Sequence, residues 1–121
     1  MKLSLITVCY NAEKTIEETI LSVIEQDLDS FEYIIIDGQS TDNTMSIINK
    51  YAKYIDLIVS ENDNGIYDAI NKGIKMSNGN IIGILNSDDI LYTKSVLSII
   101  FNKFSCCLII LLLINSFLYL L

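Results

Sequence analysis

The fold is decided by the stretch Glu32-Tyr-Ile-Ile-Ile-Asp37, which Gly38 follows directly. Its run of aromatic and β-branched residues predicts a strand that is buried on both faces of a parallel sheet. Apolar residues then recur at helical spacing over residues 42–54, which predicts a helix that runs back along the sheet. A strand followed by such a helix is the unit from which open α/β sheets are built.

The same unit occurs four times along the chain. Predicted strands cover residues 3–8, 32–37, 56–60 and 80–86, and predicted helices follow Asn11 and cover 42–54, 64–76 and 93–104. We expect Asn11 to cap the first helix and Asn78-Gly79 to end the third. Because crossovers between parallel strands are right-handed, the expected α/β fold is a parallel, Rossmann-like sheet of four βα units with helices on both faces.

Polar residues follow each predicted strand, at the edge where such sheets bind ligands. They are Tyr10 and Asn11, residues 37–42, residues 61–64 and residues 86–89. Carboxylates that gather at one edge repel each other unless a cation lies between them. We therefore expect Asp37 and the pair Asp88 and Asp89 to surround one pocket for a divalent cation and substrate phosphates. Asp and Asn are also common turn and capping residues, and this structural interpretation stays open for single positions.

Four ordered motifs resemble those of the family-two glycosyltransferases with the GT-A fold. They are Val8-Cys-Tyr-Asn11, Ile35-Ile-Asp-Gly-Gln-Ser-Thr-Asp-Asn-Thr44, Gly65-Ile-Tyr-Asp-Ala-Ile-Asn-Lys-Gly73 and Leu85-Asn-Ser-Asp-Asp89. The resemblance runs from residue 3 to residue 92. It implies that residues 1–103 form a nucleotide-sugar-binding GT-A half-domain, with residues 104–121 as an apolar tail.

The resemblance also implies contacts with the nucleotide. Tyr10 would pack on the base, with Asn11 beside it, and Asp37 would accept a hydrogen bond from a uracil imide. Asp68 and Asn71 lie three residues apart on one face of a helix and would contact the donor.

The last motif differs from the family's Asp-x-Asp pattern at its first position, which is Asn86. The resemblance implies that this motif holds the ribose and the metal, so Asp88 and Asp89 are the expected ligands of Mn²⁺ or Mg²⁺. Asn86 can hydrogen-bond a ribose hydroxyl but brings no charge to a cation. We expect the dependence on metal to be weaker for this reason.

The implied reaction is transfer of a sugar from a nucleotide sugar, expected to be UDP-linked, to a saccharide or lipid-linked acceptor in cell-surface polysaccharide biosynthesis. Inverting members of the family deprotonate the acceptor with an Asp that lies beyond the donor-binding half. No residue of this chain matches that base, so we assign no residue as the catalytic base. We expect the isolated chain to be incomplete and its activity to be weak or absent.

The composition limits the other classes of function. The 121 residues are 51% hydrophobic, carry a net charge of -7 and include no His. An acidic body without a basic stripe excludes nucleic acid as a partner. The lack of His excludes Ser-His-Asp and Cys-His catalysis. The three cysteines form neither a zinc spacing nor a disulfide framework, which favours the cytoplasm.

Residues 104–121 contain no charged side chain. A membrane span needs about 20 apolar residues, so one interpretation is an apolar helix that holds the protein at the inner face of the cell membrane. The other interpretation is an irregular tail left by a frameshift or a truncation. Both interpretations stay open.

Two other classes of α/β protein compete with a glycosyltransferase. A nicotinamide-binding Rossmann domain needs three glycines at its first turn, and residues 9–13 contain none. In a non-catalytic binding or interaction module, the acidic residues after the strands would only form turns and keep the protein soluble. Stabilisation by UDP with a divalent metal would distinguish a glycosyltransferase from such a module.

Overall fold

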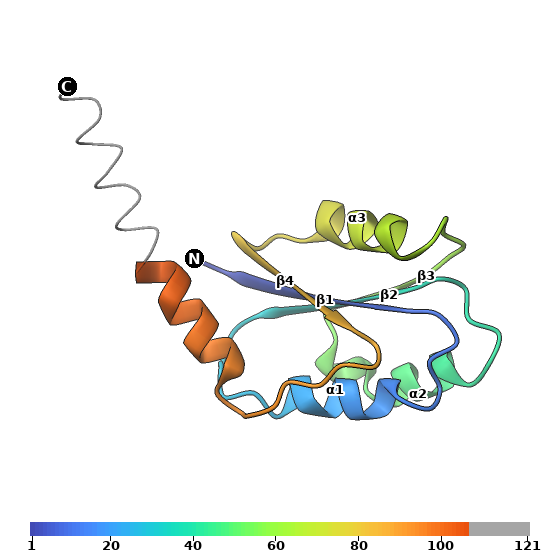
Figure 1. Cartoon of the computed structure of the whole chain (residues 1–121), viewed down its shortest axis with the longest axis horizontal. Helices are drawn as coiled ribbons and strands as arrows, with labels where there is room; N and C mark the ends of the chain where they lie inside the picture. The colour runs from blue at the N-terminus through green and yellow to red at the C-terminus, as the bar shows by residue number, and fades with distance from the viewer. Residues whose placement is uncertain (107–121) are drawn as a thin grey trace, which may run out of the picture.

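The structure, a computed structural model, describes residues 1–106, in which helices lie on both sides of a parallel sheet (Figure 1). The elements are β1 (Leu3–Cys9), α1 (Ile16–Ile24), β2 (Glu32–Asp37), α2 (Thr44–Lys50), the 3-10 helix η1 (Ala52–Tyr54), β3 (Leu57–Ser60), α3 (Ile66–Met76) and β4 (Ile81–Asn86). Residues 96–106 are also helical. The expected α/β class with four strand-and-helix units is confirmed.

The order of the strands reverses once across the sheet. The order is β3-β2-β1-β4, and every neighbouring pair is parallel. The chain moves outward from β1 through β2 to β3 and then returns to the other side of β1 to form β4. Right-handed crossovers therefore place α1 and α2 on one face and α3 on the other, as Figure 1 shows. The reversal lies between β1 and β4.

Two hydrophobic clusters form the core, one on each face of the sheet. The larger cluster lies under α1 and α2 and includes Leu5, Ile20, Tyr33, Ile48 and Leu97. The smaller cluster lies under α3 and consists of Ile6, Val8, Ile34, Ile36 and Ala69. Both β1 and β2 are buried along their whole length, which explains why their sequences are continuous apolar runs.

Gly73 allows α3 to pack closely on the sheet. A Cβ atom at this position would lie 2.6 Å from Cγ2 of Ile6 and 3.4 Å from Cγ1 of Ile36. The first distance is shorter than van der Waals contact, so any larger residue would push the helix away from the sheet. This glycine of the third motif therefore has a packing role.

Two of the predicted helix ends are wrong. The first helix starts at Ile16 and not after Asn11, and the residue at its cap position is Thr15. The third helix ends through Ser77 in an extended conformation (φ -75°, ψ 147°), without the left-handed cap expected at Asn78-Gly79. In both places, hydrogen bonds to residues distant in the sequence override the local signal. The partners are Thr41 for Asn11 and Glu32 for Asn78.

Glu32 holds the connection between α3 and β4 at the amino edge of the sheet through hydrogen bonds. The backbone N–H and the side-chain amide of Asn78 each donate to the Glu32 carboxylate at 2.8 Å. The hydroxyl of Ser4 also donates to it, and Nζ of Lys2 lies 3.5 Å away. Burial raises the pKa of Glu32, but these hydrogen bonds and the nearby cation outweigh it and lower the pKa to about 2.

The last described helix joins the core through Leu97, which is buried, and Phe101, which packs beside it. None of the helices within residues 1–106 combines the length and the apolar character that crossing a bilayer requires. Both interpretations of the apolar tail concern mainly residues 107–121, which lie outside the described part of the chain.

Candidate functional site

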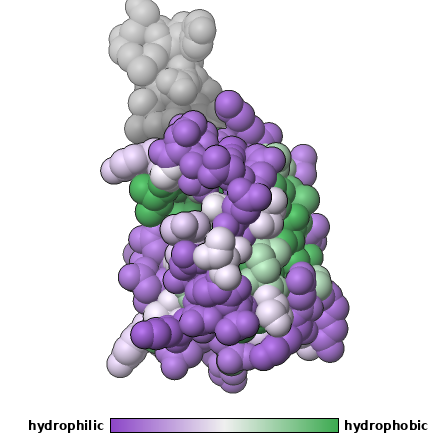
Figure 2. Space-filling view, turned by 90° about the vertical axis from the view of Figure 1, so that its right-hand side faces the viewer, coloured by the Kyte–Doolittle hydropathy of each residue, from purple (hydrophilic) through white to green (hydrophobic). Residues whose placement is uncertain are grey.

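A cavity of about 590 Å³ opens at the carboxyl edge of the sheet, where β1 and β4 end. This is the position of the strand-order reversal, at which open α/β sheets bind their ligands. Its walls come from the loop after β1, the loop after β4 and the start of α3. Figure 2 looks onto this edge, where hydrophilic residues predominate and hydrophobic residues lie toward the two sides.

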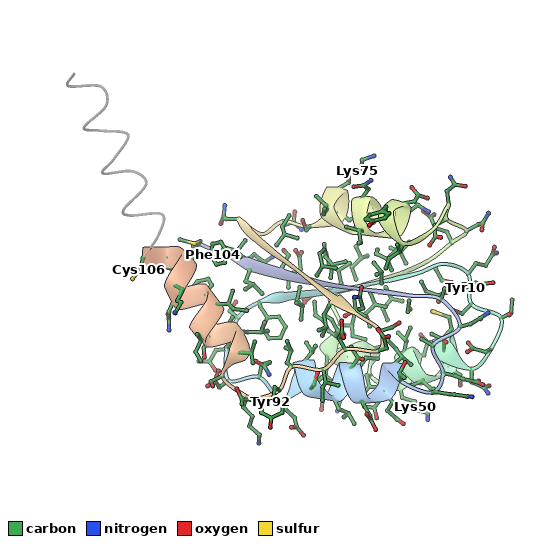
Figure 3. All side chains as sticks on the ribbon, viewed as in Figure 1. Tyr10, Lys50, Lys75, Tyr92, Phe104 and Cys106 are labelled. Atoms are coloured by element: carbon green, nitrogen blue, oxygen red, sulfur yellow. The ribbon has the colours of Figure 1, made fainter. Side chains whose placement is uncertain are left out.

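Tyr10 stands at the rim of this cavity. It follows the last residue of β1, is 63% exposed and projects at the carboxyl edge of the sheet (Figure 3). Ile66 and Ala69 of α3 also line the cavity. An exposed aromatic ring beside apolar side chains is a suitable surface for a planar base.

The acidic loop after β4 presents its two carboxylates to different surroundings. Asn86 pairs with Val8 in the sheet, and both Asn86 and Asp88 line the cavity. Asp89 does not line it; its Oδ2 lies 3.2 Å from Nδ2 of Asn86, which donates to it. The structure therefore brings only Asp88 of the predicted metal ligands to the cavity wall.

Asp37 is fully buried at the end of β2, opposite Cys9 of β1. Its Oδ2 accepts hydrogen bonds from the backbone N–H of Ser40 at 3.0 Å and from Oγ of Ser60 at 2.6 Å. Its Oδ1 accepts from the hydroxyl of Ser40 and from the thiol of Cys9. Both carboxylate oxygens are thus occupied inside the protein, and Asp37 is not among the residues that line the cavity.

The second motif joins the loop after β2 to the loop that carries Tyr10. Oγ of Ser40 accepts a hydrogen bond from the backbone N–H of Asn11 at 2.8 Å, and Oδ1 of Asn11 accepts one from the N–H of Thr41 at 2.8 Å. Oγ1 of Thr44 accepts from the N–H of Ala12, also at 2.8 Å. Asn11 adopts a left-handed conformation (φ 48°) that asparagine tolerates better than most residues. These bonds hold the cavity wall in place.

The motif on α3 lies partly outside the cavity. Oδ2 of Asp68 accepts a hydrogen bond from the N–H of Asn64 at 3.0 Å, which lowers the pKa of Asp68. Nζ of Lys72 donates to the carbonyl of Asn62 at 2.8 Å and lies 3.1 Å from Oε1 of Glu61. Neither Asp68 nor the exposed Asn71 lines the cavity. Asp68 and Lys72 instead hold the loop between β3 and α3.

Asp63 lines the cavity although the sequence did not single it out. Its Oδ1 accepts a hydrogen bond from the N–H of Gly65 at 3.0 Å, and Gly65 has a left-handed φ of 109°. Its Oδ2 lies so close to Gly38 that a Cβ atom there would be 2.7 Å away. The available signal was an acid two residues before the motif that begins at Gly65, in a loop already expected at this edge.

Cys9 also lines the cavity, but its chemistry does not suit a nucleophile. Burial raises the pKa of its thiol, and the negative charge of Asp37 raises it further. The thiolate is the reactive form of cysteine. Cys9 therefore stays protonated and donates to Asp37.

The donor set of the cavity fits a hard divalent cation that is shared with a phosphate ligand. Asp88 is an exposed carboxylate on its wall, and Mg²⁺-like ions are held by one or two carboxylates with the remaining ligands from phosphates and water. Within residues 1–106, no three acidic or cysteine side chains converge as a metal site. Asp89 would need to turn away from Asn86 to become a second ligand.

A parallel α/β sheet with a cavity at its strand-order reversal is the arrangement of the Rossmann-like α/β proteins. The model of the family described as Glycosyl transferase family 2 matches residues 4–105. The chain therefore belongs to glycosyl transferase family 2. One relative is TuaG of Bacillus subtilis (strain 168), a glycosyltransferase provisionally assigned to teichuronic acid biosynthesis, with 38% identity over 89 residues that make up 71% of this chain and 35% of TuaG.

Solved structures of glycosyltransferases share the fold. TarS 1-349 of Staphylococcus aureus in complex with UDP-GlcNAc matches 81% of this chain and 29% of its own, with 33% identity and a TM-score of 0.75. The mannosyltransferase PcManGT of Pyrobaculum calidifontis, in complex with GDP-Man and Mn²⁺, matches 78% of this chain and 30% of its own, with 28% identity and a TM-score of 0.73. The match covers 35% of TuaG, 30% of PcManGT and 29% of TarS 1-349, so the chain spans about a third of each of these three. Its fold is the Rossmann-like part of the GT-A fold.

Proposed function

We propose that this chain is the donor-binding part of a glycosyltransferase that takes a sugar from a nucleotide sugar. The nucleotide that we propose is UDP. The acceptor would be a saccharide or a lipid-linked saccharide in cell-surface polysaccharide biosynthesis. The relatives support this direction, since TuaG is assigned to teichuronic acid biosynthesis and TarS was solved with UDP-GlcNAc. The reaction would take place in the cytoplasm, at the inner face of the membrane if the tail associates with lipid.

The observation that carries the proposal is the cavity between β1 and β4. It combines an exposed aromatic ring, Tyr10, with amide and carboxylate groups from the end of β4, Asn86 and Asp88. A nucleoside diphosphate needs the same three features: a stacking surface for the base, partners for ribose hydroxyls, and a cation site for the phosphates.

Each wall of the cavity would have its own task. Tyr10 would stack on the base, and Asn86 would hydrogen-bond the ribose. Asp88 would hold a divalent cation against the diphosphate, and the chemistry which that cation supplies is neutralisation of charge on the departing group. Asp37, Asp68 and Asn71 stay predicted donor contacts that would require the surrounding loops to rearrange, because they lie outside the cavity lining.

The test is the melting temperature of the full chain with UDP and Mn²⁺. A ligand at about 100 times its Kd stabilises the folded state by about 2.7 kcal/mol, so UDP with Mn²⁺ is expected to raise the melting temperature clearly. Asp88→Asn should remove most of the part that depends on Mn²⁺, because Asp88 is the exposed acid that the loop after β4 places on the cavity wall. Asp89→Asn should remove less of it.

Asp29→Asn is the matched control, since Asp29 is an exposed acid just before β2, at the opposite edge of the sheet. It should leave the ligand-induced rise unchanged. A parent chain that UDP and Mn²⁺ do not stabilise would refute the proposal in favour of a non-catalytic interaction module. An undiminished rise in Asp88→Asn would refute the assignment of the site.

A further inference from the structure

A stripe of polar side chains on α1 binds the segment that follows β4. Thr19, Ser22 and Gln26 are spaced three and four residues apart, so they share one side of α1 and its end. Figure 1 shows the chain after β4 running back alongside α1 toward the helix of residues 96–106. The segment begins with the acidic loop that carries Asp88. None of these three residues belongs to the cavity lining.

Thr19 contacts the backbone on both sides of Asp88. Its Oγ1 lies 2.8 Å from the carbonyl oxygen of Asp89 and 3.0 Å from that of Ser87. The carbonyl oxygen of Thr15 is more distant, at 3.5 Å, so the single proton is shared mainly between Asp89 and Ser87. Thr19 is 0% exposed. Water therefore cannot readily replace this donor, and a β-branched side chain in a helix has few alternative rotamers.

The other two residues hold the segment further along. Oγ of Ser22 accepts a hydrogen bond from the N–H of Leu91 at 3.1 Å. Nε2 of Gln26 donates to the carbonyl of Thr93 at 2.7 Å, and its Oε1 accepts from the N–H of Leu97 at 3.0 Å. The stripe thus satisfies backbone groups over residues 87–97, and Thr19 is the member that acts on the acidic loop.

We propose that Thr19 is a positioning residue for the proposed donor site, which it serves by fixing the carbonyls of Ser87 and Asp89, the residues on either side of Asp88. The inference rests on the proposed function. The direction of a carboxylate on a short loop depends on the backbone around it, and Asn86 is the residue at which this loop leaves the sheet. With the carbonyls of Ser87 and Asp89 held by one buried hydroxyl, Asp88 faces the cavity before any ligand arrives. Preorganisation of this kind lowers the cost of binding.

The contrast between a positioning role and a purely structural role can be measured. Removal of a buried hydroxyl destabilises the fold in either case, because two carbonyls lose their donor. If Thr19 has a positioning role, removal of its hydroxyl also weakens the binding of the cation to the protein that remains folded. Groups that orient a metal ligand typically change metal affinity by about 10- to 100-fold when they are lost.

The experiment measures the Kd of Mn²⁺ in the presence of saturating UDP, by electron paramagnetic resonance of the free ion, together with urea unfolding of the same full-length samples. Thr19→Val keeps the shape and removes the donor, and should raise the Kd about 10-fold. Thr19→Ser restores the hydroxyl and should bind as the parent does. Ser22→Ala acts on Leu91, away from Asp88, and should lose stability without a change in the Kd.

If Thr19→Val does not fold, Thr19→Cys, of similar size but with a weaker donor, takes its place and should also raise the Kd. A Kd in Thr19→Val or Thr19→Cys equal to that of the parent would overturn the positioning role while the proposed function stands. Equal losses in the Val and Ser variants would also overturn it. A parent chain that binds neither UDP nor Mn²⁺ would overturn the proposed function and this inference with it.

Discussion

Replacing Glu32 with Gln tests how much its hydrogen bonds at the amino edge of the sheet stabilise the fold. Glu32 is 8% exposed and accepts hydrogen bonds from Ser4 and from two groups of Asn78. Gln has the same shape but no charge, so it imitates the protonated acid. One of the two carboxylate oxygens is replaced by an NH₂ group, which would face the donor groups of Ser4 or Asn78 instead of accepting from them. Glu32→Gln should therefore destabilise the chain at neutral pH and lose the pH dependence that belongs to this group.

The magnitude follows from the pKa, which falls from an ordinary value of 4.5 to about 2 in the folded chain. This difference of about 2.5 pH units corresponds to about 3.4 kcal/mol at pH 7, at roughly 1.36 kcal/mol per unit. Because the pKa is lowered by folding, the stabilisation is complete above pH 4.5 and is lost as the pH falls toward 2. At pH 3 about 1.4 kcal/mol remains, by the same linkage relation.

The assay is urea unfolding of the parent and Glu32→Gln at pH 7 and at pH 3, followed by circular dichroism. The difference between their free energies of unfolding should be about 3 kcal/mol at pH 7 and should narrow by about 2 kcal/mol at pH 3. Glu18→Gln is the matched control, because Glu18 is an exposed acid on α1. Its effect should stay within about 0.5 kcal/mol at both pH values. An equal difference for Glu32→Gln at the two pH values would refute the reasoning.

Two further predictions concern the core. Gly73→Ala should destabilise the chain by about 1–3 kcal/mol in urea unfolding, because its Cβ would lie 2.6 Å from Cγ2 of Ile6. The same substitution in an exposed helix stabilises it by about 1 kcal/mol, so a stabilised variant would contradict the packing role. The thiol of Cys9, whose pKa burial and Asp37 raise, should resist alkylation at pH 8 until urea unfolds the chain, whereas the exposed Cys106 should react in the folded state. Peptide mapping by mass spectrometry checks this, and early modification of Cys9 would argue against it.

The class of the fold could be predicted from the sequence because its signals are local. A strand buried on both faces needs a continuous apolar run, and β2 is such a run that is buried throughout. Helices with one buried face need apolar residues at helical spacing, as in α1 with Ile16, Ile20 and Val23. The helix ends at Asn11 and Asn78 were predicted less well. There the local capping preference competes with partners that are 30 and 46 residues away.

The edge of the sheet that carries the site could also be predicted, since parallel strands place all their carboxyl ends together. The strand order could not. Only the pairing of β4 with β1, rather than with β3, puts the cavity between Asn86 and Tyr10. That pairing depends on long-range packing, which leaves no periodic trace in the sequence.

The amino-acid sequence by itself determined the class of the fold, the loops that meet at the ligand-binding edge, and the motifs of the family, because each depends on residues that are near one another along the chain. The tertiary structure alone decided which acids face the cavity. Asp37 turns inward to Ser40 and Ser60, and Asp88 faces the cavity while Asp89 does not. The physical reason is that the direction of a loop side chain is set by hydrogen bonds from distant residues. Thr19, for example, donates to the carbonyl of Asp89, which lies 70 residues further along the chain.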